Sequence, residues 1–434
     1  MRELYLLLVR YGKDLHEFVW PDVQSIADYF GIDMALAEPI DNLAPRFFLV
    51  WLPDEYAARQ IGSRAAALSC VIRLWAHGTS IASLQDALRQ DPELWQPFVE
   101  SSTWRITLDT AYHHFDYDDK QRILNSFGFL DFRADIDLNQ PDLDMSVFLL
   151  ASPDDHSIRR AFAGQVICQG QRHLIAQYDV KQRLYIGNTT MQSEVSLYMS
   201  NQALAGPGKI LYDPFMGTGS SVYTSAHYGA SVLGSDIDGR HMRGKTNVGI
   251  RQCAFEYGLS DIAVLDLAVF DINLHPWRTG ELFDAIITDP PYGVRAGARK
   301  LGRKGELSQE PRLMPNGVYS HLQDDYRPPS VGWEMSEVLQ ELLSVSLYLL
   351  KPGGRLVYFL PTEDAAYKDS DVPQLAGLKL LHNSSQNFGK WSRRLITMEK
   401  TTTVTSGAAA RKTASDAGHV RFRERYLTPA VHRA

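Results

Sequence analysis

The sequence predicts an α/β protein with two main parts, an α+β N-terminal region and a larger region built on a mostly parallel, doubly wound sheet. Three observations support this fold class. Short apolar runs alternate with helical stretches over 1–180, a strand, glycine-rich turn, helix, strand order begins after 181, and several later apolar runs end at an aspartate. A chain of 434 residues has room for two or three domains.

The N-terminal region, residues 1–180, mixes strands and helices at a density typical of small α+β units. The region carries no recognisable catalytic motif, and the pair His113 and His114 fits surface or packed residues better than metal ligands, which come in clusters. Strands are expected at 3–9, 46–52, 70–78, 103–110 and 144–152, and helices at 23–32, 83–90 and 118–129.

The second region, residues 181–400, has the rhythm of βαβ units. A helix is expected at 193–204, followed by a strand, a glycine-rich turn, a helix and a second strand over 209–238. Further strands are expected at 262–273, 282–292 and 353–361, with a helix at 333–350. Residues 401–434 are poor in large apolar side chains and are expected to form a flexible tail.

Composition excludes several classes of protein. No stretch is long and apolar enough to span a membrane, and the N-terminus lacks the pattern of a signal peptide, so we expect a cytoplasmic protein with no membrane partner. The three cysteines are far apart in sequence and form no CxxC pair, which predicts neither a metal site nor a disulfide framework. The net charge is −7, so any binding of a polyanion needs locally concentrated basic residues.

Aspartates fall at the expected strand ends of the second region, and parallel strands bring such ends to one rim of a sheet, where nucleotide-like ligands bind. The loop that begins at Pro214 lets the backbone approach a ligand through Gly217 and Gly219, although Val222 breaks the GxGxxG pattern. An acid after the next strand suits a ribose diol. The acids are Asp213, Asp236 or its neighbour Asp238, Asp271 and Asp289.

The stretch "TDPPY" at 288–292 suits chemistry on an exocyclic amino group. Such a nitrogen is a poor nucleophile because its lone pair is delocalised into the ring, so a catalyst must hold the amino hydrogens with acceptors. Asp289 supplies a carboxylate and Pro290 a carbonyl, and the consecutive prolines Pro290 and Pro291 fix the backbone. Tyr292 is expected to stack on the target base.

These motifs resemble those of class I S-adenosylmethionine-dependent amino-methyltransferases, with "DPFMGTG" and "DPPY" as the most specific. "RLYIGNTTM", "SDIDGRHMRGK", "DAIITDPPYGVR" and "WSRRLITMEK" further resemble the catalytic subunits of eukaryotic tRNA (guanine-10-N2)-methyltransferases, most strongly over 180–400. The resemblance implies a Rossmann-like methyltransferase domain preceded by a ferredoxin-like unit and a THUMP domain that binds tRNA. It also implies methylation of a guanosine at position 10 of tRNA and an obligate small zinc-binding activator subunit.

The same resemblance assigns roles to residues. A set of residues would line the S-adenosylmethionine pocket: Asp213, Pro214, Gly217, Gly219, Asp236 and Asp271. Asp289, Pro290, Pro291 and Tyr292 would hold the guanine as catalytic residues. Thr190 stands where a serine is expected and keeps the hydroxyl for a substrate-binding role, whereas "IN" after Asp271 replaces the expected small residues.

A basic segment follows the motif and is the expected site of tRNA phosphate contacts, alongside the alternative of a solvated insertion. Guanine in a helix cannot reach Asp289, so we expect base flipping. The basic residues of the segment are Arg295, Arg299, Lys300, Arg303, Lys304 and Arg312.

Three other functions are weighed against this one. A DNA amino-methyltransferase shares "DPPY" but usually carries a target-recognition insert, and a release-factor glutamine methyltransferase would have an asparagine in place of Asp289. A non-catalytic RNA-binding scaffold would be expected to lose the glycines or the acid, and both are present.

Overall fold

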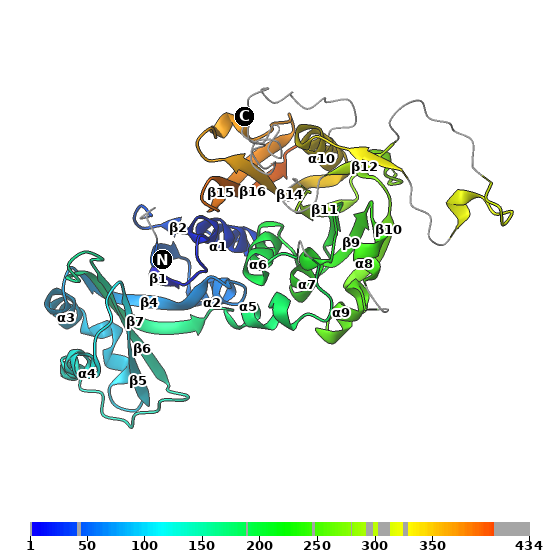
Figure 1. The fold of residues 1–434 in the computed structure, drawn as a ribbon. Helices are drawn as coiled ribbons and strands as arrows, with labels where there is room; N and C mark the ends of the chain where they lie inside the picture. The colour runs from blue at the N-terminus through cyan, green and yellow to red at the C-terminus, as the bar shows by residue number, and fades with distance from the viewer. Residues whose placement is uncertain are drawn as a thin grey trace, which may run out of the picture. The chain divides into compact units, whose positions relative to one another are not determined.

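The structure of the protein is a computed structural model that describes residues 2–40, 45–187, 190–244, 248–278, 280–291, 298–302, 313–323 and 329–402. The chain divides into two compact units, residues 1–173 and residues 174–434 (Figure 1). No helix within these ranges is long and apolar enough to cross a membrane.

The first unit contains one seven-stranded sheet in the order β2-β3-β1-β4-β7-β6-β5. Its neighbours are antiparallel except β5 and β6, which are parallel. One continuous sheet therefore replaces the separate small units that the sequence suggested. The strands are β1 (Glu3–Val9), β2 (Ala35–Leu36), β3 (Phe47–Leu52), β4 (Leu68–Gly78), β5 (Trp104–Ala111), β6 (Leu143–Ala151) and β7 (Ile158–Gln169).

The helices of the first unit start and end at recognisable caps. The side chain of Asp54 accepts the N–H of Ala57 at the start of α2, and Ser80 forms a capping box at the start of α3. Gly31 ends α1 with a φ of 66°, a conformation that suits glycine. The helices are α1 (His16–Phe30), α2 (Glu55–Gly62), α3 (Ile81–Gln90) and α4 (Tyr117–Asn125), with short 3₁₀ turns at 92–94, 96–98 and 128–130.

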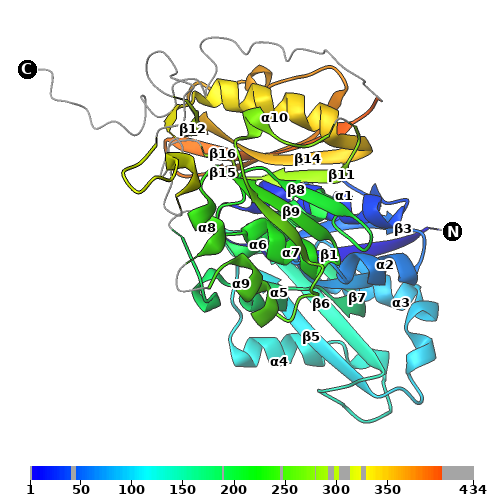
Figure 2. The same ribbon diagram turned by 90° about the vertical axis from the view of Figure 1, so that its right-hand side faces the viewer.

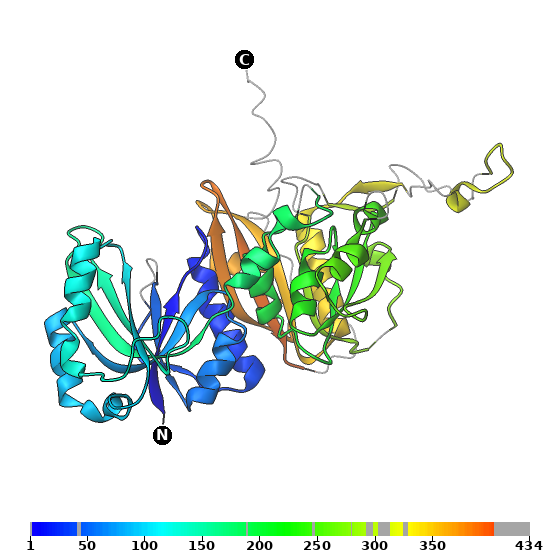
Figure 3. The ribbon, with the colours of Figure 1, turned by 90° about the horizontal axis from the view of Figure 1, so that it is seen from below.

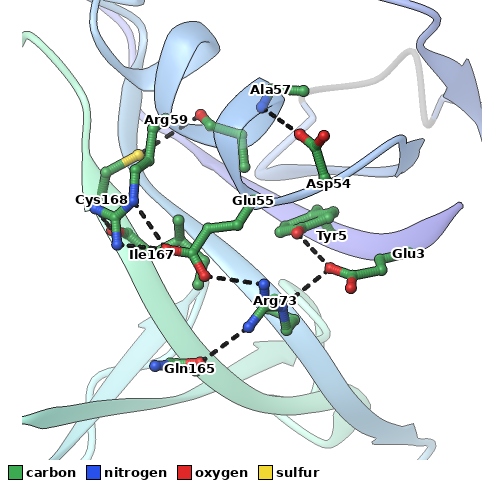
Figure 4. Close-up of polar contacts among 11 residues, drawn as sticks. Glu3, Tyr5, Asp54, Glu55, Ala57, Arg59, Arg73, Gln165, Ile167 and Cys168 are labelled. Carbon is green, nitrogen blue, oxygen red and sulfur yellow. Dashed lines mark hydrogen bonds and ion pairs between the residues drawn. The ribbon is translucent and has the colours of Figure 1, made fainter.

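A polar network ties α2 to the sheet of the first unit (Figure 4). The guanidinium of Arg73 on β4 donates to Glu3 of β1 at 3.1 Å and to Glu55 of α2 at 2.9 Å. Arg59 of α2 bonds Glu55 and also donates to the carbonyl of Ile167 on β7 at 2.7 Å. The hydrogen bond from Arg59 is the main cause that lowers the pKa of Glu55, so this carboxylate stays ionised in the network.

The second unit contains a seven-stranded sheet in the order β10-β9-β8-β11-β14-β16-β15. The first five strands are parallel, and the hairpin β15–β16 (orange in Figure 3) closes the sheet in antiparallel fashion. The predicted α/β class with a doubly wound sheet is therefore confirmed. The strands are β8 (Ile210–Asp213), β9 (Ser231–Asp236), β10 (Val264–Val269), β11 (Phe283–Thr288), β14 (Leu350–Glu363), β15 (Leu378–Asn387) and β16 (Trp391–Lys400).

Helices cover both faces of this sheet: α10 lies on one face, and α6 and α7 lie on the other (Figure 2). Leu339 and Leu342 of α10 are fully buried in a core that includes Ile286 of β11 and Leu356 of β14. A small separate hairpin pairs β12 (Arg299–Leu301) with β13 (Ser330–Gly332). The helices are α5 (His173–Gln177), α6 (Ser193–Gln202), α7 (Ser220–His227), α8 (Gly239–Arg243), α9 (Ile250–Glu256) and α10 (Met335–Leu349), with 3₁₀ turns at 180–182, 272–274, 320–322 and 369–371.

Helix α6 is buried along its whole length although six of its ten residues are polar. The hydroxyl of Ser200 lies 2.8 Å from that of Thr224 and 3.1 Å from that of Ser225, both on α7. Small hydroxyl side chains thus pair with one another where the two helices pack, and this satisfies groups that would otherwise be buried without partners.

The main differences from the sequence-based expectations are at strands that carry many polar residues. Strands β7 and β15 were not expected, because Arg159, Arg160, Lys379 and Asn383 interrupt their apolar pattern. Helix α1 begins at His16, seven residues before the expected start, and contains Pro21. Proline usually ends such a pattern, but here the helix is held by the burial of Phe18 and Val19.

Candidate active site

The four aspartates picked out in the sequence lie at one rim of the second sheet. Asp213 ends β8, Asp236 ends β9, Asp289 directly follows β11, and Asp271 follows β10 by two residues. The four strands are adjacent and parallel, so their carboxyl ends meet at the same edge. In folds of this kind the ligand binds at that edge.

The glycine-rich loop between β8 and α7 has a backbone that few other residues could adopt. Gly217 has a φ of 52° and Gly219 a φ of 80°. A Cβ atom at Gly219 would lie 2.9 Å from Cγ1 of Ile250, so packing as well as conformation requires glycine there. Helix α7 begins at Ser220 with no side-chain cap at Gly219, which leaves its first N–H groups to meet an anion.

Asp213 is buried and its carboxylate is fully engaged by the protein. Ser221 of α7 donates to one oxygen at 2.6 Å, and Thr288 of β11 donates to the other at 2.7 Å. The backbone N–H of Phe215 also donates to the carboxylate at 3.0 Å. Burial raises the pKa of Asp213 to about 6, against the opposing effect of these hydrogen bonds. The residue therefore joins the glycine-rich loop to the strand that carries Asp289.

Asp236 is only partly engaged and is half-buried at the end of β9. One oxygen accepts the N–H of Gly217 at 2.9 Å and the other accepts the N–H of Asp238 at 2.8 Å. Each carboxylate oxygen has further lone pairs, which suits a ribose diol. The neighbouring Asp238 instead caps α8 and pairs with Arg240, which lowers the pKa of Asp238 to about 2. The sequence named Asp236 and Asp238 as alternatives. Of these two, Asp236 has more carboxylate lone pairs available to a ligand, because Asp238 is paired with Arg240.

Asp271 is buried and holds protein groups on both oxygens. One oxygen accepts from the backbone and side chain of Asn273, at 2.9 and 2.8 Å. The other accepts the N–H of Leu301 at 2.6 Å. The carboxylate therefore links strand β12 of the small hairpin to the end of β10. Asn273, which stands where a small residue was expected, supplies two of the three hydrogen bonds.

Asp289 differs from the other three because its Oδ1 is buried and makes no hydrogen bond to any described residue. Burial raises the pKa of Asp289 to about 6, and the positive charge of Arg393 acts in the opposite direction. Pro290 is buried directly behind it and Pro291 is half-buried. A carboxylate acceptor at a strand end, next to a fixed carbonyl, is the feature that amino-group chemistry requires.

The segment before α6 packs on the glycine-rich loop. The hydroxyl of Thr190 lies 3.1 Å from that of Thr218, and Ser220 accepts from the N–H of Met191 at 3.2 Å. Arg183 donates to Ser220 at 3.1 Å while its guanidinium lies 4.5 Å from the ring centre of Tyr223. Thr190 therefore lies beside the loop that the sequence assigned to the cofactor.

Only some of the residues expected to contact tRNA after the "DPPY" motif are among the described residues. Arg299 of β12 donates to the hydroxyl and the carbonyl of Ser330 on β13, at 2.7 and 2.6 Å. Lys300 pairs with Glu337 of α10 at 2.8 Å. Both side chains are thus held by other residues of the second unit. Tyr292 and Arg295, together with Arg303, Lys304 and Arg312, lie outside the described residues.

Two known protein families match separate parts of the chain. The family described as Tmrp11 THUMP N-terminal domain matches residues 5–161, and the family described as RMKL-like, methyltransferase domain matches residues 181–307. Among solved structures, TrmN from Thermus thermophilus is similar with a TM-score of 0.42 and 17% identity, over 92% of this chain and 99% of that chain.

Curated relatives match over nearly the full length. The tRNA (guanine(10)-N(2))-methyltransferase TRMT11 of Homo sapiens is 33% identical over 99% of this chain and 96% of its own. The chain belongs to the tRNA (guanine(10)-N(2))-methyltransferase family. The member from Schizosaccharomyces pombe is 32% identical over 91% of this chain and 85% of its own. The resemblance noted in the sequence is confirmed.

Members of the tRNA (guanine(10)-N(2))-methyltransferase family use S-adenosylmethionine as methyl donor, and the residues at this rim fit such a ligand. The donor has a ribose diol, a carboxylate and a sulfonium. Asp236 has lone pairs to spare for the diol, and the start of α7 presents N–H groups to a carboxylate. The buried Oδ1 of Asp289, which has no hydrogen-bond partner among the described residues, has the chemistry of an acceptor for an amino group.

Sequence reasoning missed Ser221 and Thr288, which hold Asp213, as well as Arg183 and Arg393. Thr288 directly precedes the "DPPY" motif and could have been suspected for that reason. No spacing in the sequence links Arg393 to Asp289, because the two lie 104 positions apart (393 minus 289) and meet only through the order of strands β11, β14 and β16.

Proposed function

We propose that this chain methylates the exocyclic N2 of a guanosine at position 10 of tRNA and is the catalytic subunit of a two-subunit enzyme. Membership of the tRNA (guanine(10)-N(2))-methyltransferase family supports the reaction. The observation that carries the proposal is the buried carboxylate oxygen of Asp289, which has no hydrogen-bond partner in the part of the chain that the structure describes. It lies at the rim where the glycine-rich loop and Asp236 also lie.

The donor would be held by one set of groups at the rim. Asp236 would accept from the ribose diol, and the loop from Pro214 to Gly219 with the start of α7 would bind the amino-acid end. Asp213 would act indirectly, by holding the loop in place, because its carboxylate already accepts hydrogen bonds from Ser221 and Thr288. Asp271 would shape the adenine end through β12. S-adenosylmethionine supplies an electrophilic methyl group on a sulfonium.

Asp289 and Pro290 would hold the acceptor. The Asp289 carboxylate accepts one hydrogen of the guanine amino group and the Pro290 carbonyl accepts the other. This arrangement would favour a tetrahedral nitrogen whose lone pair is withdrawn from the ring and faces the methyl group. The new N–C bond would form as the S–C bond breaks with its electrons left on sulfur, and the carboxylate is the proposed acceptor of the proton that the nitrogen loses. Pro291 keeps both acceptors in place, because proline fixes the backbone. Tyr292 would stack on the flipped base, at about 1–3 kcal/mol for such a contact.

Binding of tRNA would involve both units. The THUMP family match over 5–161 supports a tRNA-binding role for residues 1–180, and the methyltransferase domain would extend over 181–400, with 401–434 as a tail. Within the second unit, Thr190, Arg295, Arg299 and Lys300 are the proposed substrate contacts. Arg299 and Lys300 would have to exchange their present partners Ser330 and Glu337 for phosphates.

A small zinc-binding activator subunit is the proposed protein partner. Among the described residues, strand β10 pairs with β9 alone and forms one edge of the sheet. Apolar side chains are exposed on and around this edge, and an added chain could cover them by pairing with the strand. They are Phe255, Ile262, Leu265, Val269 and Leu274. The free thiols of Cys70, Cys168 and Cys253 suit the proposed cytoplasmic location, because thiols stay reduced there.

The test is a methyl-transfer assay with the chain co-expressed with its partner, labelled S-adenosylmethionine and unmodified tRNA, followed by nucleoside analysis. We expect N2-methylguanosine from the wild-type chain and a loss of roughly 10²–10³-fold in rate for Asp289→Asn, which changes the acceptor into an amide. Asp261→Asn, at an exposed position of the same unit, is the matched control. Cofactor and tRNA binding without any methylated guanosine would instead indicate a non-catalytic scaffold.

A further inference from the structure

Arg393 lies on β16, which is separated by β14 from β11, the strand that Asp289 directly follows. In the sheet, Thr288 of β11 is opposite Tyr358 of β14, so Asp289 comes next to Phe359. The guanidinium carbon of Arg393 lies 4.4 Å from the ring centre of Phe359. Figure 2 shows β14 between β11 and β16. The contact with Phe359 therefore places the Arg393 guanidinium over β14, on the side of β16 that faces β11.

The guanidinium of Arg393 is fixed in place but only partly used. Its Nε donates to Gln386 of β15 at 2.7 Å, and its planar group also lies 5.6 Å from the ring centre of Phe388. No hydrogen bond of its two terminal nitrogens is found within the described part of the chain. A planar pair of donors, held at Nε and flanked by two rings, is ready to bind two acceptors side by side.

The turn between β15 and β16 adds an exposed aromatic surface next to this group. The rings of Phe388 and Trp391 are stacked with centres 4.6 Å apart, and Phe388 is 47% exposed. Exposed stacked rings beside an arginine suit a planar, unpaired base better than an isolated phosphate. The burial of Asp289 raises the pKa of that carboxyl and the charge of Arg393 counters it, which also indicates that the two groups share one site.

We propose that Arg393 selects guanine as the acceptor base, its terminal nitrogens donating to O6 and N7 while Asp289 accepts from the N2 amino group. The proposal rests on the function proposed above and adds the basis of base selection. Guanine presents two acceptors on this edge, whereas adenine presents an amino donor at position 6. Because a guanidinium has donors only, it binds the first pattern and rejects the second.

The test uses the complete two-subunit enzyme and tRNA in which the target guanosine is replaced by 2-aminopurine, which keeps the N2 amino group and N7 but lacks O6. For Arg393→Met we expect kcat/KM on guanosine tRNA to fall about 30-fold while kcat/KM on 2-aminopurine tRNA stays within about 3-fold of the wild-type value. Arg393→Lys keeps the charge without the planar pair of donors and is expected to lose the same discrimination.

Arg394→Met is the matched control. This neighbouring arginine points to the other face of the sheet, where its guanidinium lies 3.4 Å from the ring centre of Tyr367. Cofactor affinity and thermal unfolding of each variant show whether the fold is intact. If Arg393→Met did not fold, Arg393→Lys would provide the same comparison.

Two results would overturn the proposal. An equal fall on both tRNAs, confined to KM, would mean that Arg393 contacts a tRNA phosphate and not the base. Unchanged kinetics on guanosine tRNA would remove Arg393 from the acceptor site. Failure of the proposed function itself is a different outcome, since the wild-type enzyme would then form no N2-methylguanosine on any tRNA.

Discussion

Among single residues, Asp289 has two conflicting requirements. In its proposed role it must be ionised to accept amino hydrogens, yet burial disfavours its charge and raises its pKa to about 6. Because the pKa in the folded chain is above that of an unfolded aspartate, this group lowers the stability of the fold as the pH rises from about 4 to about 6. Above that range the full cost, on the order of 1–3 kcal/mol, is present. The proposed acceptor role of Asp289 therefore comes at a cost in the stability of the fold.

The first prediction at this scale concerns pH. Protonation of Asp289 removes an acceptor, so kcat/KM is expected to fall on acidification through pH 6, by about tenfold per unit below it. The positive charge of Arg393 lowers the pKa of Asp289, so Arg393→Met should move this acidic limb to higher pH. A pH profile of single-turnover methylation measures both effects. A limb at the same pH in the variant would show that the two groups do not interact.

The second prediction concerns the bond from Thr288 to Asp213. Thr288→Val keeps the shape of the side chain but removes the hydroxyl that fixes the strand end beside Asp289. We expect kcat to fall about tenfold with KM for tRNA unchanged, and the free energy of unfolding to drop by about 1–2 kcal/mol. Thr288→Ser restores the donor and should restore kcat. A valine variant as fast as the wild-type chain would remove Thr288 from the positioning of Asp289.

At the scale of elements, the sequence predicted best where local pattern and packing agree. The strand, glycine turn and helix from β8 to α7 were placed correctly because Asp213, Gly217 and Gly219 mark the strand end and the turn. Strand β15 was missed because its residues alternate poorly, and its place is set by pairing with β16. The roles of Asp213 and Asp271 also needed the structure, since only it shows which donors occupy their oxygens.

The prediction for an element compares the two edges of the second sheet. Leu265 on edge strand β10 is 40% exposed and Leu380 on edge strand β15 is 39% exposed. If the activator subunit pairs with β10, Leu265→Lys should reduce co-purification of the subunit by at least about tenfold, because a charge would be buried at the interface. Leu380→Lys should leave it intact. Equal retention by both variants would place the partner elsewhere.

For the whole molecule, the net charge of −7 has to be reconciled with binding of a polyanion. Many basic side chains of the described residues are paired with acids, as Arg73 is with Glu3 and Glu55, and as Lys300 is with Glu337. Affinity for tRNA must then come from a few local positive groups and from recognition of shape. The sequence alone could not predict which charges remain unpaired, because the fold decides which basic and acidic side chains meet.

The buried carboxylate of Asp213 has a consequence for how the family can change over time. The Asp213 carboxylate accepts hydrogen bonds from Ser221 of α7 and from Thr288 of β11 at the same time. The helix that follows the glycine-rich loop and the strand that precedes Asp289 are therefore both held by this one side chain. Replacement of any one of the three leaves a buried group unsatisfied. The three positions should therefore vary together among homologues, and a lineage that loses one would be expected to carry compensating replacements at the other two.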